Sequence, residues 1–542
     1  MDCIFTNGHF YDEQDLLRDV SAVLARDGRV VRMARNTDEL GLSADEREDA
    51  ETVDLQGAWV YPGFADTHLH ILNAALTAHM LPLEKAKNKD ELLSMIAGAA
   101  KELPEGSWIE GRGFNQDLWP EAVLPEKREL DAAAPLHPVR ITRVCGHMMI
   151  ANSAAFEKQG LHPGMPLPEG GTVDFDKGII TENALFLMSA GGGDPGVEHC
   201  KQMLAEGLNM AADHGLTYLY SDDLTAGDYA KETVMEAYRQ LSEEGKMPVR
   251  VVEQCALATD EELDAFVKNG HTYLSGNSFF RVGPRKLYAD GSLGAGTAWL
   301  CEPYADGEGK GENGCGVPTC TREGLSAMFV HAHRAGFPCI VHAIGDAAAE
   351  CVLDAAEYAG SAAAEGSVPA DGIVHCQITS ERTLRRIREL NLRVYAQPVF
   401  AEYDLHICRR RVGEKRESTS YNWKTLLESG VCVSSGSDCP VESLDPAGNI
   451  YCAVTRKDYT GFPEGGWMPE QRLSVRQAIA CHTYLAAKAM GFEQERGRIA
   501  PGFPADFTVY PCSLEAVPPE EILCFKPLMT VLGGKVRLCG KG

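Results

Sequence analysis

The motif DTHLH (residues 66–70) follows a short apolar run and carries two histidines two residues apart. In an extended chain, side chains at positions i and i+2 point to the same side, so His68 and His70 can reach one metal ion. His331 and His333 have the same spacing but lie in a segment with helical character, where such side chains diverge by about 200°. We therefore predict that only the first pair binds metal.

Three further candidate ligands stand at the ends of apolar runs. His342 ends a run in CIVHAIGD, His375 ends one in GIVHCQ, and Asp438 follows one in VSSGSDCPVE. Each alone is an ordinary polar residue, but chance explains poorly why four histidines and an aspartate all stand at such ends. Imidazole nitrogens and carboxylate oxygens suit Zn²⁺, with Mn²⁺ or Fe²⁺ as alternatives.

These side chains need a scaffold that brings the ends of strands together. Short apolar runs alternate with helical segments, which is the pattern of βα units. Eight such units favour a closed TIM-type (β/α)8 barrel, an α/β fold whose active site lies at the carboxyl ends of the strands. A doubly wound open sheet would need a glycine-rich phosphate fingerprint, and the sequence has none after its first strand. The predicted strands are Ala58–Phe64, Leu216–Ser221, Val249–Ala256, Phe280–Ala289, Pro338–Val341, Gly372–His375, Arg393–Pro398 and Val431–Ser435.

The two chain ends differ from this middle part because they read as short strands joined by turn signals. We expect residues 1–60 and 497–542 to form one small β-sandwich, with the barrel inserted between them as residues 61–496. The first two predicted barrel strands are separated by far more residues than a βα loop contains. We expect residues 83–200 or thereabouts to form an insertion that covers the barrel mouth.

Charge and hydropathy exclude several classes of protein. The 542 residues include 51 Lys and Arg against 78 Asp and Glu, a net charge of −27 that disfavours nucleic acid as a partner. No apolar run is long enough to span a membrane, and the first residues lack the features of a signal peptide. The 18 cysteines include no C-x-x-C pair. We expect a cytoplasmic protein with reduced thiols and a small-molecule substrate.

Several segments, in order along nearly the whole chain, resemble the amidohydrolase superfamily. Within it they are most similar to amidohydrolase family 3, the group of YtcJ-like proteins and N-substituted formamide deformylases. The segments are PGFADTHLH (62–70), RKLYADGSLG (285–294), VHAIGD (341–346), IVHCQ (373–377) and GSDCPVE (436–442), supported by GFNQDLWP (113–120), GHMMIANSAAF (146–156) and GRIAPGFPADFTVY (497–510).

The resemblance implies a (β/α)8 barrel with a small β-sandwich built from both termini, and it implies metal ligands and a base. It gives Asp438 a second role as the general base. A bound divalent metal lowers the pKa of water towards ~7 and polarises a carbonyl, as amide hydrolysis requires. The implied ligands are His68, His70, His342, His375 and Asp438.

Lys286 matches the position at which binuclear members of the superfamily carry a carboxylated lysine that bridges two metals. An ammonium group beside two divalent cations is electrostatically unfavourable, so a ligand role for Lys286 requires the carbamate formed with CO₂. The alternative is a lysine that pairs with Asp290. The resemblance favours the bridge.

Other polar residues are candidates for the pocket and for orienting the ligands. The resemblance implies that His147 approaches the substrate, and a capping or core role is the alternative. Asp346 is expected to accept a hydrogen bond from His342, because imidazole ligands donate their second N–H to a carboxylate or carbonyl. Asp290 is a further candidate for this supporting layer, and no role follows for Glu182. The expected pocket residues are His147, Gln116, Asp117, Trp119 and Gln397.

Three functions are consistent with these residues. We favour hydrolysis of a C–N bond in an amide, an N-substituted formamide or a cyclic amide. A deaminase of a heterocycle with one metal ion is the second, and Lys286 counts against it. A non-catalytic ligand-binding barrel is the third, and it should have lost ligands that this chain retains. A homodimer is the commonest state expected of a soluble enzyme.

Overall fold

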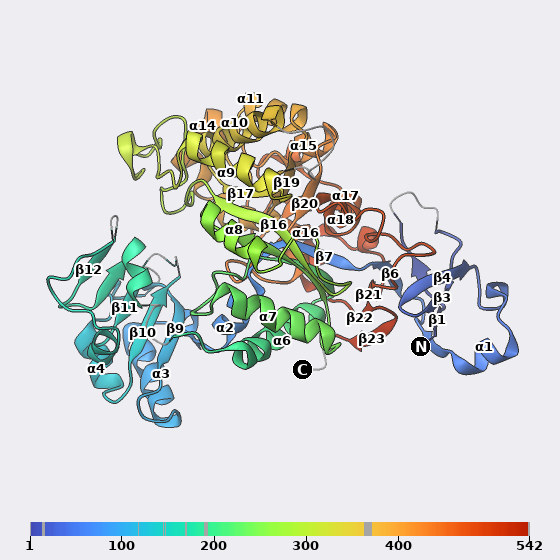
Figure 1. Ribbon diagram of the computed structural model, residues 1–542, viewed down its shortest axis with the longest axis horizontal. Coiled ribbons are helices and arrows are strands. Elements are labelled where there is room, and N and C mark those ends of the chain that lie inside the picture. The colour runs from blue at the N-terminus through green and yellow to red at the C-terminus, as the bar shows by residue number, and fades with distance from the viewer. Residues whose placement is uncertain are drawn as a thin grey trace. The chain divides into compact units, whose positions relative to one another are not determined.

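Eight parallel strands form the central sheet, and they follow one another around it in sequence order (Figure 1). They are β7 (Phe64–Leu69), β14 (Leu216–Ser221), β15 (Arg250–Ala256), β16 (Phe280–Tyr288), β17 (Cys339–Ala343), β18 (Gly372–His375), β19 (Arg393–Ala396) and β20 (Val433–Ser435). The first and last strands lie side by side, because Thr67 Oγ1 donates to Ser434 Oγ at 3.0 Å. The sheet is therefore nearly closed, and the predicted TIM-type barrel is confirmed.

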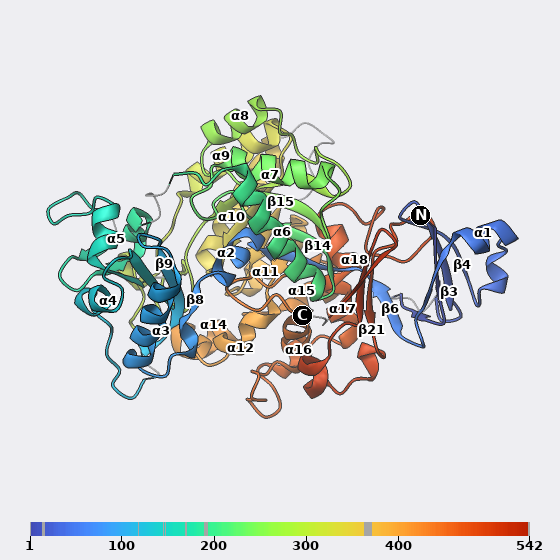
Figure 2. The ribbon, with the colours of Figure 1, turned by 90° about the horizontal axis from the view of Figure 1, so that it is seen from below.

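Helices follow most of these strands along the chain, as expected of βα units (Figures 1 and 2). Three of them begin at Thr259, Thr321 and Ser380, whose hydroxyls accept a hydrogen bond from the N–H three residues on. The longer helices are α6 (Val197–Asp213), α7 (Lys231–Glu243), α8 (Asp260–Lys268), α9 (Arg322–Arg334), α10 (Asp346–Ala362), α11 (Glu381–Glu389), α16 (Pro446–Thr455), α17 (Val475–His482) and α18 (Tyr484–Ala489). Shorter helices between β19 and β20 are α12 (Ala401–Asp404), α13 (Cys408–Val412), α14 (Glu414–Glu417) and α15 (Trp423–Glu428).

The prediction of Ala58–Phe64 as the first barrel strand is wrong. Strand β6 (Trp59–Pro62) belongs to another sheet, and the barrel strand begins at Phe64. Both strands are buried, so the apolar run crosses from one sheet to the next without a change in pattern. The boundary is Gly63, where a Cβ would lie 2.1 Å from Thr217 Oγ1. His68 consequently lies within the strand rather than beyond it.

Strands from both chain ends form two small sheets that share one core. One has the order β4-β3-β1-β5 and the other β2-β6-β21-β22-β23. Two hairpins turn at Asp27-Gly28 and Gly533-Gly534, and all four residues have positive φ, as the tight turns require. The predicted sandwich of both termini is confirmed. The remaining strands are β1 (Cys3–Thr6), β2 (His9–Phe10), β3 (Ala22–Arg26), β4 (Arg29–Ala34), β5 (Glu51–Asp54), β21 (Phe507–Tyr510), β22 (Met529–Leu532) and β23 (Lys535–Leu538).

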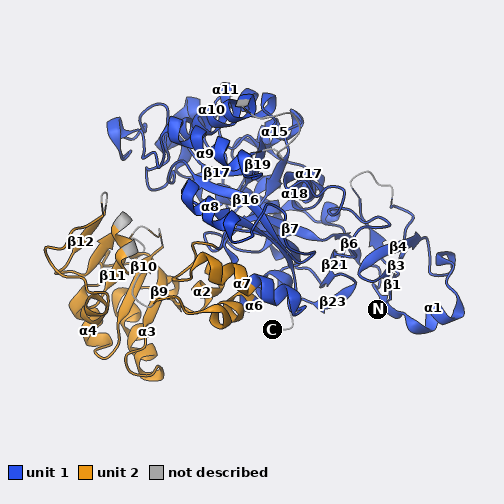
Figure 3. Ribbon diagram, viewed as in Figure 1, with its two compact units in different colours: residues 1–71, 205–223, 238–542 blue, residues 72–204, 224–237 orange. Residues whose placement is uncertain are grey.

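The chain divides into two compact units (Figure 3). The first contains the barrel and the terminal sheets, in residues 1–71, 205–223 and 238–542, and the second contains residues 72–204 and 224–237. The structure is a computed structural model, and it describes residues 2–12, 17–116, 119–144, 146, 148–168, 171–188, 193–362 and 371–539. Within these ranges, no helix is long and apolar enough to cross a membrane.

The second unit has a six-stranded sheet of its own, in the order β12-β13-β11-β10-β9-β8. Its core includes Leu92 and Ile96 from one helix and Ile109 and Ile141 from two strands, all buried. The long segment between the first two barrel strands therefore folds around a separate hydrophobic core. Its elements include α2 (Ile71–Ala78), β8 (Leu81–Pro82), α3 (Lys89–Glu102), β9 (Ile109–Phe114), α4 (Lys127–Ala133), β10 (Val139–Arg143), β11 (Met148–Ala151), α5 (Ser153–Lys158), β12 (Thr172–Asp174) and β13 (Ile179–Thr181).

Candidate metal centre

The five expected ligands converge at the carboxyl ends of barrel strands. Asp438 Oδ1 lies 3.5 Å from His68 Nε2 and 3.2 Å from His70 Nε2. His375 Nε2 lies 2.9 Å from His342 Nδ1. The ligand atoms of His68, His375 and Asp438 all lie within 4.8 Å of one another, and all three residues are buried.

Two glutamines fix the orientation of two of these imidazoles. His68 Nδ1 lies 2.6 Å from Gln254 Oε1, and His375 Nδ1 lies 2.7 Å from Gln397 Oε1. Each glutamine donates its Nε2 to a backbone carbonyl, on Thr67 and Tyr395 respectively, so its oxygen must be the atom facing the ring. An amide oxygen only accepts hydrogen bonds, so both Nδ1 atoms carry protons.

Backbone carbonyls fix the other two imidazoles. His70 Nδ1 lies 2.7 Å from the carbonyl oxygen of Asp222, and His342 Nε2 lies 3.1 Å from that of Gly291. A carbonyl oxygen is an acceptor, so these nitrogens also donate. Each of the four rings then directs its second nitrogen to the same place, as metal-binding histidines do.

The donor set fits a divalent cation. His375 Nε2 and His342 Nδ1 are 2.9 Å apart, and the partners of both rings leave a lone pair on each of these atoms. Two lone pairs at that distance repel each other, and a cation between them turns the repulsion into shared coordination. Four imidazole nitrogens with a carboxylate are ligands that Zn²⁺, Mn²⁺ or Fe²⁺ accepts.

The pKa shifts of the four histidines agree with a site that binds a cation. Burial lowers the pKa of His68 and His342 well below the usual value and that of His375 to about 4, which keeps these rings neutral. Burial also acts on His70, but the hydrogen bond to Asp438 and the Asp222 carboxylate outweigh it and raise the pKa to about 9. The field that attracts a proton to His70 would attract a metal cation in the same way.

Lys286 is buried in β16 and pairs with a residue that the sequence did not single out. Its Nζ donates to Asp222 Oδ2 at 3.2 Å and lies 4.1 Å from the centre of the Tyr288 ring. The Tyr288 hydroxyl donates to the same carboxylate oxygen at 2.8 Å. The expected alternative partner, Asp290, is therefore wrong, because Asp290 directs both oxygens to backbone N–H groups of Trp299, Ile344 and Gly345.

The chain matches the sequence model of the amidohydrolase family over residues 51–538. It belongs to that family. It is 30% identical to the "Putative amidohydrolase YtcJ" of Bacillus subtilis (strain 168), over 90% of each chain. It is 26% identical to the N-substituted formamide deformylase of Arthrobacter pascens, over 90% of this chain and 89% of that one.

A solved structure agrees with the sequence match. The crystal structure of a metal-dependent hydrolase from Pyrococcus horikoshii OT3 superimposes with a TM-score of 0.80 at 28% identity. The similarity covers 96% of this chain and 99% of the other. The amidohydrolase is a metal-dependent hydrolase with a His/His/Asp group that can bind a metal.

The supporting layer of this amidohydrolase differs from the expected one at Asp346, whereas Asp290, the other expected member, lies beside His342. Asp346 does not contact His342, because it begins α10 and accepts the N–H groups of Cys301 and Ala347. Asp290 Oδ1 is the nearer carboxylate, at 3.5 Å from His342 Nε2. Burial raises the pKa of both aspartates, but of the two only Asp290 lies beside a candidate ligand.

The expected pocket residues have varied positions. Gln397 uses both ends of its amide within the barrel, on His375 and on Tyr395, so it orients a ligand instead of facing substrate. Trp119 is buried in the core of the second unit, where its Nε1 donates to the Ala86 carbonyl at 2.9 Å. Gln116 also lies in that unit and accepts from Arg143 Nε at 3.0 Å. His147, Asp117 and the side chain of Glu182 lie outside the described part of the chain.

Sequence reasoning missed Asp222, Gln254 and Tyr288. Asp222 follows the second barrel strand directly, in the position that drew attention to Asp438 after the eighth. Tyr288 lies two residues beyond Lys286 in one strand and therefore shares its side of the sheet. The rule that identified the histidines, polar residues at strand ends, would have found Asp222 and Tyr288 had it been applied to every strand, whereas Gln254 lies inside β15.

The backbone at the centre is strained. His375, Cys376 and Asp438 have φ values of 77°, 54° and 58°, in the left-handed region that residues other than glycine rarely adopt. Such conformations cost on the order of 1–3 kcal/mol each and cluster at functional sites. In this amidohydrolase they turn the chain sharply where two candidate ligands leave their strands.

Proposed function

We propose that this protein hydrolyses a C–N bond in an amide, an N-substituted formamide or a cyclic amide. The observation that carries the proposal is the convergence of four imidazole nitrogens and one carboxylate oxygen, with each imidazole held by a partner outside the centre. Similarity to an N-substituted formamide deformylase supports the choice of bond. In this reaction water adds to the carbonyl carbon, the C–N bond breaks, and the nitrogen leaves with a proton.

His68, His70, His342, His375 and Asp438 would hold the metal. A divalent ion bound there would supply Lewis acidity towards water and the scissile carbonyl. Asp438 would accept a proton from the attacking water and return it to the leaving nitrogen. The hydrogen bond from His70 and the nearby His68 and His375 outweigh burial and hold the pKa of Asp438 well below its usual value, so the carboxylate starts ionised.

Formate release from N-substituted formamides tests this proposal. We expect the metal-loaded wild type to release formate, and Asp438→Asn to lose at least ~10²-fold in kcat, because an amide cannot accept the proton. Asp346→Asn is the matched control, since an amide oxygen can still accept the backbone N–H groups of Cys301 and Ala347. Asp438→Asn with wild-type kcat would refute the role of Asp438.

A second candidate function follows from the Lys286–Asp222 pair. Lys286 Nζ lies 3.2 Å from the buried Asp222 carboxylate, and a lysine that stays in this ion pair provides no bridge between two metals. A site with one metal ion is typical of heterocycle deaminases. Ammonia release from heterocyclic amines, without formate release from formamides, would favour this function over the first.

A further inference from the structure

A cavity of about 860 Å³ lies at the amino-terminal ends of β15 and β16, remote from the candidate ligands. The turns at Asp27-Gly28 and Gly533-Gly534 also line it. Along β16, Arg281 at the cavity is five residues from Lys286, which is ~16 Å of extended chain. The cavity is therefore distinct from the candidate metal centre.

The lining of this cavity has the opposite sign to the chain as a whole. Seven Lys and Arg residues face three acidic ones, in a protein with a net charge of −27. A cluster of cations in an otherwise acidic molecule concentrates anions locally. The basic residues are Arg29, Lys246, Arg250, Arg281, Arg496, Lys535 and Arg537, and the acidic ones are Asp27, Glu51 and Glu495.

Two of the buried or half-buried arginines have carboxylate partners. Arg250 forms a two-pronged ion pair with Asp506, at 2.7 and 3.1 Å, and Arg281 pairs with Glu495 at 3.2 Å. Lys246 and Arg537 pair with acids just outside the cavity wall, Glu244 and Asp213. These four charges are already largely compensated.

Arg496 differs because it is buried and has no carboxylate partner among the described residues. Its Nη2 donates to the Ser278 carbonyl at 3.3 Å, an oxygen that also accepts from Arg250 Nη1 at 2.9 Å. Its Nη1 is buried without a hydrogen-bond partner in the described chain. Burial lowers the pKa of Arg496 and the Arg250 charge adds to that effect, while Tyr218 and the Asp506 carboxylate act in the opposite direction.

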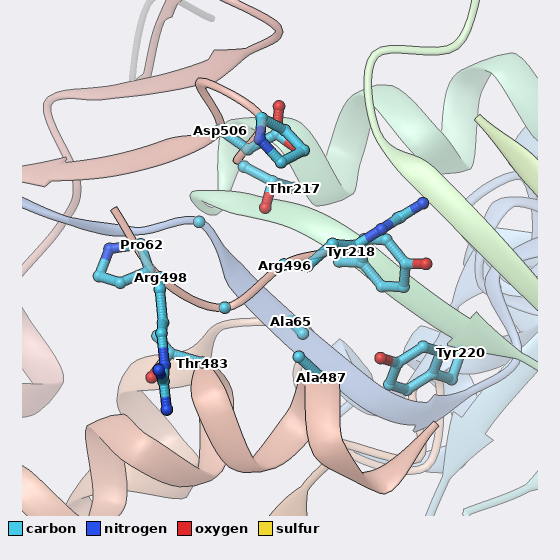
Figure 4. Close-up of a pocket in the computed structure, with 13 residues that line it drawn as sticks. Pro62, Ala65, Thr217, Tyr218, Tyr220, Thr483, Ala487, Arg496, Arg498 and Asp506 are labelled. Atoms are coloured by element: carbon cyan, nitrogen blue, oxygen red, sulfur yellow. The ribbon is translucent and has the colours of Figure 1, made fainter. Parts of the chain in front are cut away.

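A buried guanidinium without an ion pair of its own is costly, and the Asp506 carboxylate that acts on Arg496 is already bonded to Arg250, so Arg496 has room for a second counter-ion. Stacking on the Tyr218 ring, with the guanidinium carbon 3.9 Å from its centre, offsets part of the cost (Figure 4). A second cavity beside these two residues, about 20 Å³ in volume, has room for about one water molecule. One water would satisfy a donor but would leave the charge without a partner.

We propose that the 860 Å³ cavity binds a small organic anion through a phosphate or carboxylate group, with Arg496 as the principal contact. The flat fork of a guanidinium pairs with two oxygens of either group. The volume lies within the range of about 300–1,000 Å³ that small-molecule sites occupy. Met247, Phe279 and Val536 give the cavity an apolar wall for the organic part of the ligand.

Calorimetric titration of the purified protein with pyrophosphate and with citrate, at constant ionic strength, tests the proposal. We expect one saturable site for at least one of the two anions, and the stronger binder identifies the group. Arg496→Gln should weaken that binding at least tenfold, because hydrogen bonds to a charged donor are lost. Arg388→Gln, an exposed arginine on α11, should leave it unchanged. Arg496→Gln should keep wild-type hydrolysis.

Two results would overturn the proposal. One is a wild type that binds neither anion, and the other is equal binding by wild type and Arg496→Gln, which would assign the anion to the metal centre. If Arg496→Gln does not fold, Arg281→Gln at the cavity edge should still weaken binding severalfold. A crystal soaked in selenate should then show an anomalous peak beside the Arg496 guanidinium, and a peak only at the metal centre would refute the site.

Discussion

At the residue scale, the candidate metal centre depends on hydrogen bonds that fix the orientation of each histidine ring. The imidazoles of His68 and His375 were recognisable from sequence, because histidines at strand ends are a known signal for metal. Gln254 was not, because a glutamine inside a buried strand carries no signal of its own, and Gln397 was predicted to line the pocket. Which nitrogen carries the proton depends on that partner, and the partner is visible only in the folded chain.

Replacing Gln397 tests this dependence. Gln397→Leu keeps the size of the side chain but removes the acceptor of His375 Nδ1, so the ring loses its fixed tautomer and orientation. We expect the affinity for Zn²⁺ to fall 10–100-fold, the usual cost of losing such a partner. Competition with a chromogenic chelator measures it. Gln471→Leu is the control, because the Gln471 amide bonds Thr425 and no candidate ligand, and an equal loss there would contradict the account.

At the scale of elements, the sequence predicts the existence of strands better than their boundaries. Seven of the eight predicted barrel strands overlap the observed ones closely, because apolar runs bounded by turns are a strong signal. The first was misplaced because β6 and β7 are both buried, and one run of apolar residues serves two sheets. Only the close approach of Gly63 to Thr217 separates them, and a contact between distant segments leaves no periodic trace.

Gly63→Ala tests this boundary. The added Cβ would lie 2.1 Å from Thr217 Oγ1, so Thr217 or the strand must move. We expect a loss of about 1–3 kcal/mol in the free energy of unfolding, the usual cost of overpacking. Gly360 lies in α10, and a Cβ added there would meet no atom of a neighbouring element within 4 Å. Gly360→Ala should therefore be neutral or stabilising. Urea unfolding of both variants measures the difference, and equal midpoints would contradict the packing argument.

At the scale of the whole molecule, the sequence indicated a barrel, a sandwich built from both ends and a long segment between the first two barrel strands. Each follows from local patterns, namely alternating βα units, hairpin turns and an excess of residues. The partner of Lys286 does not, because Asp222 and Lys286 are 64 residues apart and meet only when the barrel closes. The net charge of the whole chain was also a poor guide to local charge. A chain of net charge −27 contains a cavity whose charged lining residues are mainly basic.

Metal content per chain tests the central claim most directly. Wild type, Lys286→Ala and the double variant His68→Ala/His375→Ala would be purified without chelator, with bicarbonate present, and measured by elemental analysis. We predict at least one divalent ion per wild-type chain and none in the double variant. About two ions in wild type, falling to one or none in Lys286→Ala, would support a carboxylated bridge, and one in both would favour a deaminase. A metal-free wild type that hydrolyses formamides, or a double variant with full metal content, would contradict the account.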